Sequence, residues 1–389
     1  MPKIFITSYP YVYERYFRVF DYFKNKKDLI FILPDNWQAK KKGHYFFAPK
    51  RDDIKIITAK AYFWHSHYPL IGGLMKGWMP ATGKILKEYS HPGDILFTVN
   101  EPNHLSVLYN AFLAKKYKLK HVIYADQNVP YVQRMGGLKL KFVGWIIRKN
   151  VTMAEKIFYS NKKSREILLN YSPTEKLIFA PESGVDVEKF RPGLESGWRT
   201  KYNLSNKIIF CFAGMLEARK GIIEILRAFL FVSKNIPDAV LLFIGFGPEK
   251  KRAQEFVRNN DLLSKVIFVD FVDNDELPYF LSAIDVFVCY SLPFKGWEEQ
   301  LGYAIKEAMA SGAPVISTNT GSIDEAVVSG NNGILVKPYD EKALISGMLL
   351  LAQNNPKRLS MGSNARDYAI RHFSHQVIAE TLESALFSV

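Results

Sequence analysis

The chain has 389 residues, 48% of them apolar, which is enough for two domains that each bury a core of their own. Its cysteines, Cys211 and Cys289, both lie within apolar runs and indicate buried thiols, which excludes a disulfide framework. The first residues form a strand pattern without the apolar core of a signal peptide, and no run reaches the ~18 apolar residues needed to cross a bilayer. We therefore expect a cytoplasmic protein without a spanning helix.

Charge is divided unevenly along the chain. Residues 1–190 hold 31 Lys and Arg against 16 Asp and Glu, a net charge of +15, whereas residues 191–389 have a net charge of −1. A basic half attracts nucleic acid, an anionic membrane surface or a phosphorylated substrate, because long-range fields do not specify a partner. No nucleic-acid-binding motif accompanies the charge, so nucleic acid is not an expected partner.

One basic stretch, 138–149, interleaves Lys and Arg with large apolar and aromatic side chains. This pattern is typical of a segment in the headgroup region of an anionic membrane. It is equally typical of a core helix whose lysines reach out to solvent. Both interpretations stay open at the level of the sequence.

Strand and helix patterns alternate along the whole chain, as a doubly wound α/β architecture requires. The first half predicts strands at 3–7, 29–33, 54–57, 95–99, 121–124, 156–160 and 176–180, and helices near 11–24, 103–118 and 162–171. The second half predicts strands at 208–213, 240–245, 266–271, 286–290, 314–317 and 334–336, and helices at 221–235, 249–259, 275–283, 302–311, 322–328, 340–353 and 357–371. Two parallel sheets follow, with a boundary at 181–193, where two prolines and two glycines interrupt the pattern.

A pair of glutamates carries the strongest functional signal. Glu307 lies in a predicted helix that Gly312 and Pro314 end before a strand, and Glu299 precedes this helix in a loop. Between the two acids, Gly302 lets the backbone approach a ligand, and the free N–H groups of the helix start suit a phosphate or a sugar hydroxyl. Two glutamates at this spacing also occur by chance as solvated helix charges, so the neighbouring motifs decide.

A second candidate site follows the strand at 208–213. The turn from Gly214 to Gly221 presents Arg219 and Lys220 at the start of a helix. Cations at such a corner suit a diphosphate group, and the alternative is that they are merely solvated charges at a helix start.

The order of these segments resembles the donor-binding half of the family 4 glycosyltransferases. The resemblance extends from 181 to 375, about half the chain, and rests on several ordered motifs. The segments that carry it are 213–221, 241–248, 285–288, 299–318, 320–321, 324–325 and 330–338. It implies the GT-B fold, in which two Rossmann-like, doubly wound parallel-sheet domains face a central cleft.

The same resemblance implies a domain plan. An N-terminal acceptor-binding domain would occupy 1–185, a donor-binding domain 186–371, and a C-terminal helix at 372–389 would cross back to the first domain. The implied activity is a retaining transfer of a sugar from a UDP- or GDP-linked donor to a hydroxyl of a glycan or lipid-linked acceptor. This role belongs to polysaccharide or glycolipid biosynthesis at the cytoplasmic face of a membrane. The implied scheme needs no cofactor and no metal.

The resemblance also assigns roles to residues of this chain. Glu299 would contact hydroxyls of the donor sugar and Lys220 would face the departing diphosphate, so these two are the candidate catalytic residues. Glu307 would take the ribose hydroxyls. The remaining candidates for donor binding are Arg219, Gly214, Gln300, Leu301, Gly302 and Tyr303.

The chain departs from the family at several positions. Met215 stands where an Arg directed at the phosphates is usual, and Arg219 is the candidate substitute. In the first half, Ser8-Tyr9-Pro10-Tyr11 replaces the paired glycines that usually follow the first strand.

Three polar residues follow strands of the first half and are candidates for the acceptor cleft. They are Asp126, Gln127 and Asn103, and capping of the next element is the alternative for each. Because a fold does not determine its chemistry, two other functions remain open. One is a sugar epimerase or hydrolase on the same frame, and the other is a basic nucleic-acid-binding protein with a decayed donor site.

Overall fold

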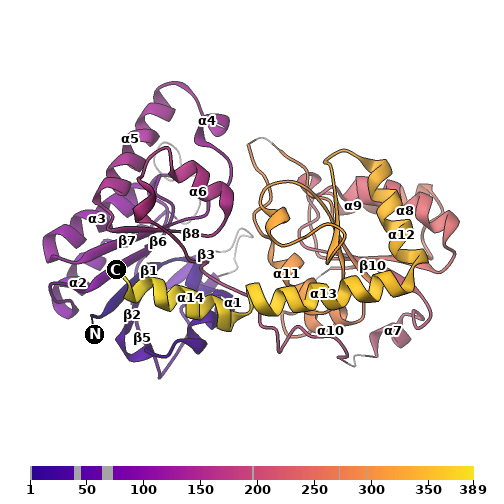
Figure 1. Ribbon diagram of the computed structural model, residues 1–389, viewed down its shortest axis with the longest axis horizontal. Coiled ribbons are helices and arrows are strands. Elements are labelled where there is room, and N and C mark those ends of the chain that lie inside the picture. Colours follow the sequence, from indigo (N-terminus) through magenta and orange to yellow (C-terminus); the bar gives the residue numbers. More distant parts are fainter. Residues whose placement is uncertain (1, 39–44, 64–72, 195–196, 271, 295) are drawn as a thin grey trace. The chain divides into compact units, whose positions relative to one another are not determined.

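The computed structural model describes residues 2–38, 45–63, 73–194, 197–270, 272–294 and 296–389. The chain divides into two compact units, which we call unit 1 (residues 1–184 and 375–389) and unit 2 (residues 185–374). In Figure 1 each unit is a sheet surrounded by helices. The predicted α/β class with two parallel sheets is confirmed.

The sheet of unit 1 has seven strands in the order β5-β2-β1-β6-β7-β8-β9, all parallel. Its central strands are continuous apolar runs, because helices cover both faces of such a sheet. The strands are β1 (Ile4–Ser8), β2 (Leu29–Pro34), β5 (Lys55–Ala59), β6 (Ile95–Val99), β7 (Lys120–Ala125), β8 (Lys156–Tyr159) and β9 (Leu177–Phe179). A separate antiparallel pair is formed by β3 (Asn36–Gln38) and β4 (Tyr45–Phe47). Every strand predicted in this half is present, with ends that differ by about two residues at most.

The helices of unit 1 are α1 (Glu14–Phe17), α2 (Thr82–Tyr89), α3 (Leu105–Tyr117), α4 (Tyr131–Arg134), α5 (Gly137–Met153), α6 (Lys162–Leu168) and α14 (His375–Phe387). The sequence analysis missed α2. It also missed that α5 is a single helix extending beyond the basic stretch 138–149 at both ends.

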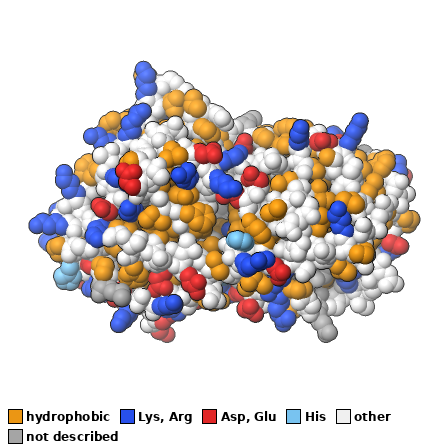
Figure 2. All heavy atoms as spheres, viewed as in Figure 1, with side chains coloured by type: hydrophobic (Ala, Val, Ile, Leu, Met, Phe, Trp, Pro, Cys, Tyr) orange, Lys and Arg blue, Asp and Glu red, His pale blue; other side chains and the backbone are white. Residues whose placement is uncertain are grey.

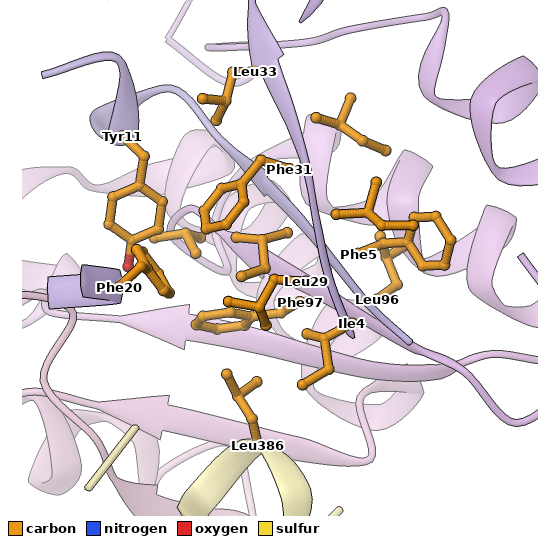
Figure 3. Packing of buried hydrophobic residues seen from close by; sticks show 14 of the residues in the cluster. Ile4, Phe5, Tyr11, Phe20, Leu29, Phe31, Leu33, Leu96, Phe97 and Leu386 are labelled. Atoms are coloured by element: carbon orange, nitrogen blue, oxygen red, sulfur yellow. The ribbon is translucent and has the colours of Figure 1, made fainter. Parts of the chain in front are cut away.

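The single helix predicted near 11–24 is wrong. The chain instead forms the short α1 between two 3-10 turns, Pro10–Val12 and Arg18–Tyr22. The buried residues Tyr11, Phe17 and Phe20 are spread around the circumference of an ideal helix, so one continuous helix cannot turn them all to the core. The broken path brings the rings of Tyr11 and Phe20 together edge to face, with their centroids 4.9 Å apart. Figure 3 shows these two rings next to each other.

Helix α14 completes the core of unit 1. Leu382 and Leu386 are fully buried in the same cluster as the central strands, and Figure 3 shows Leu386 pointing at that cluster. The carboxylate of Glu383 accepts the backbone N–H groups of Lys24 and Asn25 at 3.1 and 2.9 Å. The last helix is therefore bound by both apolar packing and hydrogen bonds.

The sheet of unit 2 is also fully parallel, in the order β12-β11-β10-β13-β14-β15. Its strands are β10 (Ile208–Ala213), β11 (Ala239–Ile244), β12 (Val266–Val269), β13 (Val286–Cys289), β14 (Val315–Thr318) and β15 (Gly333–Val336). Each was predicted, although position 271 at the end of the third prediction lies outside the described residues. The strand order reverses between β10 and β13, and in open parallel sheets ligands bind at such a point, beyond the carboxyl ends of the strands.

The helices of unit 2 are α7 (Trp198–Lys201), α8 (Ile222–Asn235), α9 (Lys250–Asn259), α10 (Leu277–Ser282), α11 (Tyr303–Ala310), α12 (Glu341–Gln353) and α13 (Asn355–Phe373). The helix predicted at 322–328 is only a 3-10 turn, Ile323–Glu325. The Asn332 side chain closes it early, because it donates to the Ala326 carbonyl at 3.0 Å and accepts the Val328 N–H at 2.8 Å. In the described part of the chain, no helix combines the length and the apolar character needed to cross a bilayer.

Candidate functional site

Two loops of unit 2 meet where the strand order reverses. The loop after β10 ends at Lys220, and the loop after β13 contains Glu299, 79 residues further along. The Lys220 ammonium forms an ion pair with Glu299 Oε2, which also accepts a hydrogen bond from Ser291 Oγ at 2.7 Å. The Lys220 side chain is only 16% exposed, so its interpretation as a solvated charge at a helix start is wrong.

The backbone around Lys220 leaves it little freedom. Gly221 has a φ of +64°, and a Cβ at this position would lie 2.3 Å from the carbonyl oxygen of Tyr290. The neighbouring Arg219 carbonyl accepts the Leu292 N–H at 2.8 Å, which ties the loop after β10 to the loop after β13. Only glycine fits at 221, and the close approach of the two loops places Lys220 beside Glu299.

Glu299 is fixed by its own backbone contacts. Its carbonyl accepts the Ser322 N–H at 3.0 Å, and a Cβ on Gly321 would lie 1.5 Å from that same oxygen. The adjacent acid, Glu298, faces a different partner, since its carboxylate accepts the Gly321 N–H at 3.1 Å. The two neighbouring acids are therefore distinct, and Glu299 is the one that reaches Lys220.

Trp297 lies beneath both candidate cations, and the sequence analysis missed it. The Arg219 guanidinium is 3.8 Å from the centroid of its ring, and the Lys220 Nζ is 5.1 Å away. Arg219 Nε also donates to Glu217 Oε2 at 2.5 Å. No motif marks a lone aromatic residue in a loop, and only the folded loops reveal this contact.

The position that lacks the usual arginine lies in the same turn. Gly214 directly follows β10, and its N–H donates to the Ile244 carbonyl at 2.9 Å. Met215, next to it, is exposed. Arg219 directly precedes Lys220 in this turn, and Glu217 and Trp297 hold its guanidinium in place.

Helix α11 begins next to the ion pair. Gly302 precedes its first turn, and among the described residues no side chain caps this end of the helix. A Cβ on Gly302 would lie 3.5 Å from Glu299 Oε1, so the carboxylate is beside the helix start. Glu307 is buried within α11, which confirms its predicted location on a helix, with Glu299 in the preceding loop.

The remaining predicted donor residues lie around this helix start. Gln300 is exposed, whereas Leu301 is half-buried against the core of unit 2. Tyr303 is the first residue of α11, and the Lys306 Nζ lies 4.7 Å from the centroid of its ring. All three therefore belong to the segment that joins Glu299 to α11.

Cys289 lies at the end of β13, close to the ion pair. Its Sγ is 3.6 Å from Ser291 Oγ. Burial raises the pKa of this thiol, the negative charge of Glu299 raises it further, and Lys220 opposes the shift. The thiol is uncharged near neutral pH, so Lys220 and Glu299 supply the charge here.

In unit 1, the structure places Asp126 and Gln127 directly after β7. The Asp126 N–H donates to Glu101 Oε1 at 2.9 Å, and Gln127 donates to the Val129 carbonyl at 2.8 Å. Neither residue caps the next helix, because the residue that precedes α4 is Pro130. The capping interpretation of these two residues is therefore wrong.

The third acceptor candidate, Asn103, lies half-buried in the turn before α3. The residue at the cap position of that helix is His104, whose side chain makes no capping bond within the described chain and instead contacts Asn100 Oδ1 at 2.6 Å. Capping by Asn103 is wrong as well, since it lies one residue outside the cap position.

Glu101 was also missed by the sequence analysis. Burial raises the pKa of its carboxyl well above the usual range, and the nearby Asp126 carboxyl raises it further. Its Oε2 atom is buried without a hydrogen-bond partner among the described residues. Its place just after β6 was the available signal, because ligands of parallel sheets bind at the carboxyl ends of strands.

The point of strand reversal in unit 1 lies between β1 and β6 and is largely filled by side chains. The ring of Tyr9 stacks on Trp37 with centroids 4.4 Å apart. A small polar cavity of about 10 Å³ remains, room for roughly one water molecule. Its lining includes Thr7, Ser8, Tyr9, Thr98, Asn100, Ser106 and Asn110.

Comparison with known proteins supports the predicted family resemblance. Residues 196–368, which include the whole candidate site of unit 2, match the family model of the group 1 glycosyl transferases. Over this part, which is less than half of the chain, the sequence is similar to that family. An uncharacterized glycosyltransferase of Methanocaldococcus jannaschii is 24% identical over 349 residues, which cover 85% of this chain and 86% of that relative. The predicted enzyme class, a glycosyltransferase, is thereby confirmed.

Two further similarities bear on acceptor and fold. A GDP-mannose-dependent alpha-(1-6)-phosphatidylinositol monomannoside mannosyltransferase of Mycolicibacterium smegmatis is 27% identical over 204 residues, 51% of this chain and 53% of that relative. The match therefore spans about half of each of these two glycosyltransferases. The crystal structure of the Anabaena protein HepE in complex with UDP has a TM-score of 0.75 at 17% identity and covers the whole of both chains. The predicted GT-B fold is confirmed.

Proposed function

We propose that this glycosyltransferase moves a sugar, with retention of its anomeric configuration, from a UDP- or GDP-linked donor to a hydroxyl of a glycan or lipid-linked acceptor. Unit 2 would bind the donor and unit 1 the acceptor. The observation that carries the proposal is the partly buried Lys220–Glu299 pair beside the start of α11. Two similar proteins support the donor class, since the HepE structure contains UDP and the M. smegmatis mannosyltransferase depends on GDP-mannose.

The chemistry of donor cleavage fits these groups. Departure of a nucleoside diphosphate develops negative charge on the leaving phosphate, and fixed positive groups stabilise it most when they are already in place. Lys220 is held by Glu299, and Arg219 is held by Glu217 and Trp297, so both cations are positioned before any ligand arrives. The start of α11 adds a partial positive charge from the helix dipole.

The two acids have different proposed roles. Glu299 would accept hydrogen bonds from hydroxyls of the donor sugar, because a carboxylate accepts several hydrogen bonds at once. Glu307 would bind the ribose hydroxyls. Backbone and side chains of Gln300, Leu301, Gly302 and Tyr303 would line the sugar pocket. In unit 1, Asp126, Gln127 and Asn103 remain the proposed acceptor residues.

Lipid-linked acceptors are consistent with the similar M. smegmatis enzyme, which is a phosphatidylinositol monomannoside mannosyltransferase. We therefore propose a role in glycolipid or polysaccharide synthesis at the cytoplasmic face of a membrane.

The first test is thermal stabilisation by nucleotides. UDP, GDP and ADP, each with its common sugar conjugates, are added to the purified chain, because a ligand that binds only the native state raises its melting temperature. One nucleotide is expected to raise it, and the rise should disappear in Glu307→Ala. No rise with any donor would contradict the donor site.

Retention needs a separate measurement. NMR of the product formed by the stabilising donor should show the same anomeric configuration as in that donor. An inverted product would refute the retaining mechanism while leaving the donor site intact.

A further inference from the structure

Helix α5 has two apolar faces, of which only one is covered. Val143, Ile147 and Val151 pack in a buried cluster with Val107 of α3 and Ile123 of β7. On the other side, Leu138, Phe142 and Trp145 are 84%, 48% and 46% exposed. The inner face explains why this segment is a helix, but it does not explain three large exposed apolar side chains.

The exposed residues form one continuous stripe. At about 100° per residue, positions 138, 142 and 145 lie within roughly 60° of one another around the helix axis. The rings of Phe142 and Trp145 are parallel, 10° apart, with centroids 6.0 Å from each other. Val132 of the neighbouring α4 is exposed as well. Such a patch is unlike the singly scattered apolar residues of an ordinary protein surface.

The charged residues of α4, α5 and the segments that flank them have a single sign. Residues 127–154 contain five Lys and Arg and no Asp or Glu. Lys139, Lys141 and Lys149 are exposed along the helix, so cations border the apolar stripe on both sides and at its end. In Figure 2, blue and orange side chains occur together at the part of unit 1 where Figure 1 labels α4 and α5.

We propose that the outer face of α5 docks onto the headgroup region of a bilayer containing anionic lipid. Leu138, Phe142 and Trp145 would enter the boundary between headgroups and acyl chains, where aromatic rings are favoured. The bordering lysines would contact anionic headgroups. An ordinary apolar protein partner explains the stripe but not the segment 127–154, which contains five Lys and Arg and no acidic residue. This docking surface goes beyond the proposed transfer reaction and does not depend on it.

The test measures co-sedimentation of the full chain with vesicles. One set is pure phosphatidylcholine, and the other is an equal mixture of phosphatidylcholine and phosphatidylglycerol. We expect binding to the anionic set only. The variant with Leu138→Ser, Phe142→Ser and Trp145→Ser should bind at least tenfold more weakly, and so should Lys139→Glu with Lys141→Glu.

A matched control is Phe231→Ser, which removes an equally exposed ring from α8 of unit 2. It should bind vesicles like the unchanged chain. All altered positions are exposed, so melting temperatures should stay the same, and nucleotide stabilisation by unit 2 should persist in every variant. That second readout separates failure of membrane docking from failure of the proposed donor site.

A direct measurement locates Trp145. Brominated lipids should quench part of the tryptophan fluorescence, and Trp145→Phe should abolish that quenching while vesicle binding continues. The proposal is overturned if the unchanged chain binds no vesicles or binds both sets equally, or if the triple Ser variant binds as well as the control. A concentration-dependent dimer that the triple variant loses, without vesicle binding, would overturn it in favour of contact with a second copy.

Discussion

The two sheets reverse their strand order at equivalent points, but the loops at these points carry different chemistry. In unit 2, between β10 and β13, Lys220 and Glu299 form a partly buried ion pair between two loops locked by backbone contacts. In unit 1, between β1 and β6, Tyr9 stacks on Trp37 and leaves a cavity of about 10 Å³. The architecture provides a point of strand reversal in both units, whereas the residues of the loops there decide whether charge or aromatic packing occupies it.

The largest effect is expected from Lys220→Met in unit 2. It removes the charge while keeping the length of the side chain, and kcat should fall about 10²–10³-fold, as for loss of one preorganised group that stabilises the transition state. Steady-state kinetics measure it, with Lys251→Met on the exposed side of α9 as the control.

Stability separates this effect from misfolding. Lys220→Met leaves Glu299 buried without its cation, so the melting temperature should drop. Adding Glu299→Gln should restore the melting temperature but not the activity. Full activity of Lys220→Met would contradict the proposed role of Lys220. The charge at the strand reversal of unit 2 would then give that point no functional difference from the one in unit 1.

The next effect compares a glycine in each unit. Gly321→Ala places a Cβ 1.5 Å from the Glu299 carbonyl, and Gly77→Ala places one 2.8 Å from the Tyr9 ring. A backbone carbonyl cannot move aside as a side chain can, so we expect the Gly321 variant to lose about 3 kcal/mol of unfolding free energy and the Gly77 variant about 1 kcal/mol. Denaturant unfolding of both variants measures this difference. Equal losses of unfolding free energy in the two variants would mean that the loops at the two points of strand reversal are equally rigid.

Trp297→Ala tests whether the aromatic ring positions the cations of unit 2. A partly desolvated cation over an indole contributes ~1–2 kcal/mol, so nucleotide affinity should fall about tenfold. Titration calorimetry with the stabilising nucleotide measures it. Trp297→Phe keeps an aromatic face and should lose less. If the Phe and Ala variants bind alike, the ring has no part in holding Arg219 and Lys220.

The smallest effect concerns the acid of unit 1. Because the pKa of Glu101 is raised in the native state, the native chain keeps a proton that the unfolded chain loses once pH exceeds the usual pKa of a glutamate. The free energy of unfolding therefore falls as pH rises through that window, by at most about 1.4 kcal/mol per pH unit.

Glu101→Gln removes this dependence while keeping the shape of the side chain. Melting temperatures between about pH 5 and about pH 8 should decline less steeply for this variant. Curves that remain parallel to those of the unchanged chain would contradict the buried, protonated acid. Asp53→Asn, at an exposed ion pair, is a control outside this cluster.

Local patterns predicted most of this fold because parallel strands buried on both faces are unbroken apolar runs. The strands Ile95–Val99 and Ile208–Ala213 were predicted with their observed ends. Sequence patterns did not predict the structure where irregular turns place side chains in the core, as at Tyr11 and Phe20. They also did not predict it where one helix has two apolar faces, as α5 does. In such segments hydrophobic periodicity no longer distinguishes inside from outside.

The candidate site was predictable only in its parts. Lys220 and Glu299 each lie in a recognisable motif, but their ion pair depends on the approach of two loops, which local sequence does not reveal. Trp297 gains its significance from neighbours distant along the chain, and no local pattern marks it. Glu101 is marked only by its place just after β6, and its burial is not visible in the local sequence. Roles for the donor residues are predictions that the variants at Lys220, Glu299 and Glu307 test, and the acceptor roles remain predictions.

The course of the chain through its two units also has a consequence for synthesis. Unit 2 is continuous from 185 to 374, whereas unit 1 needs α14 from the last residues to complete its core and to bind the N–H groups of Lys24 and Asn25. When residue 184 has been synthesised, most of unit 1 is therefore present, but the helix that completes its core is not. The unit that is translated first is the one that finishes folding last.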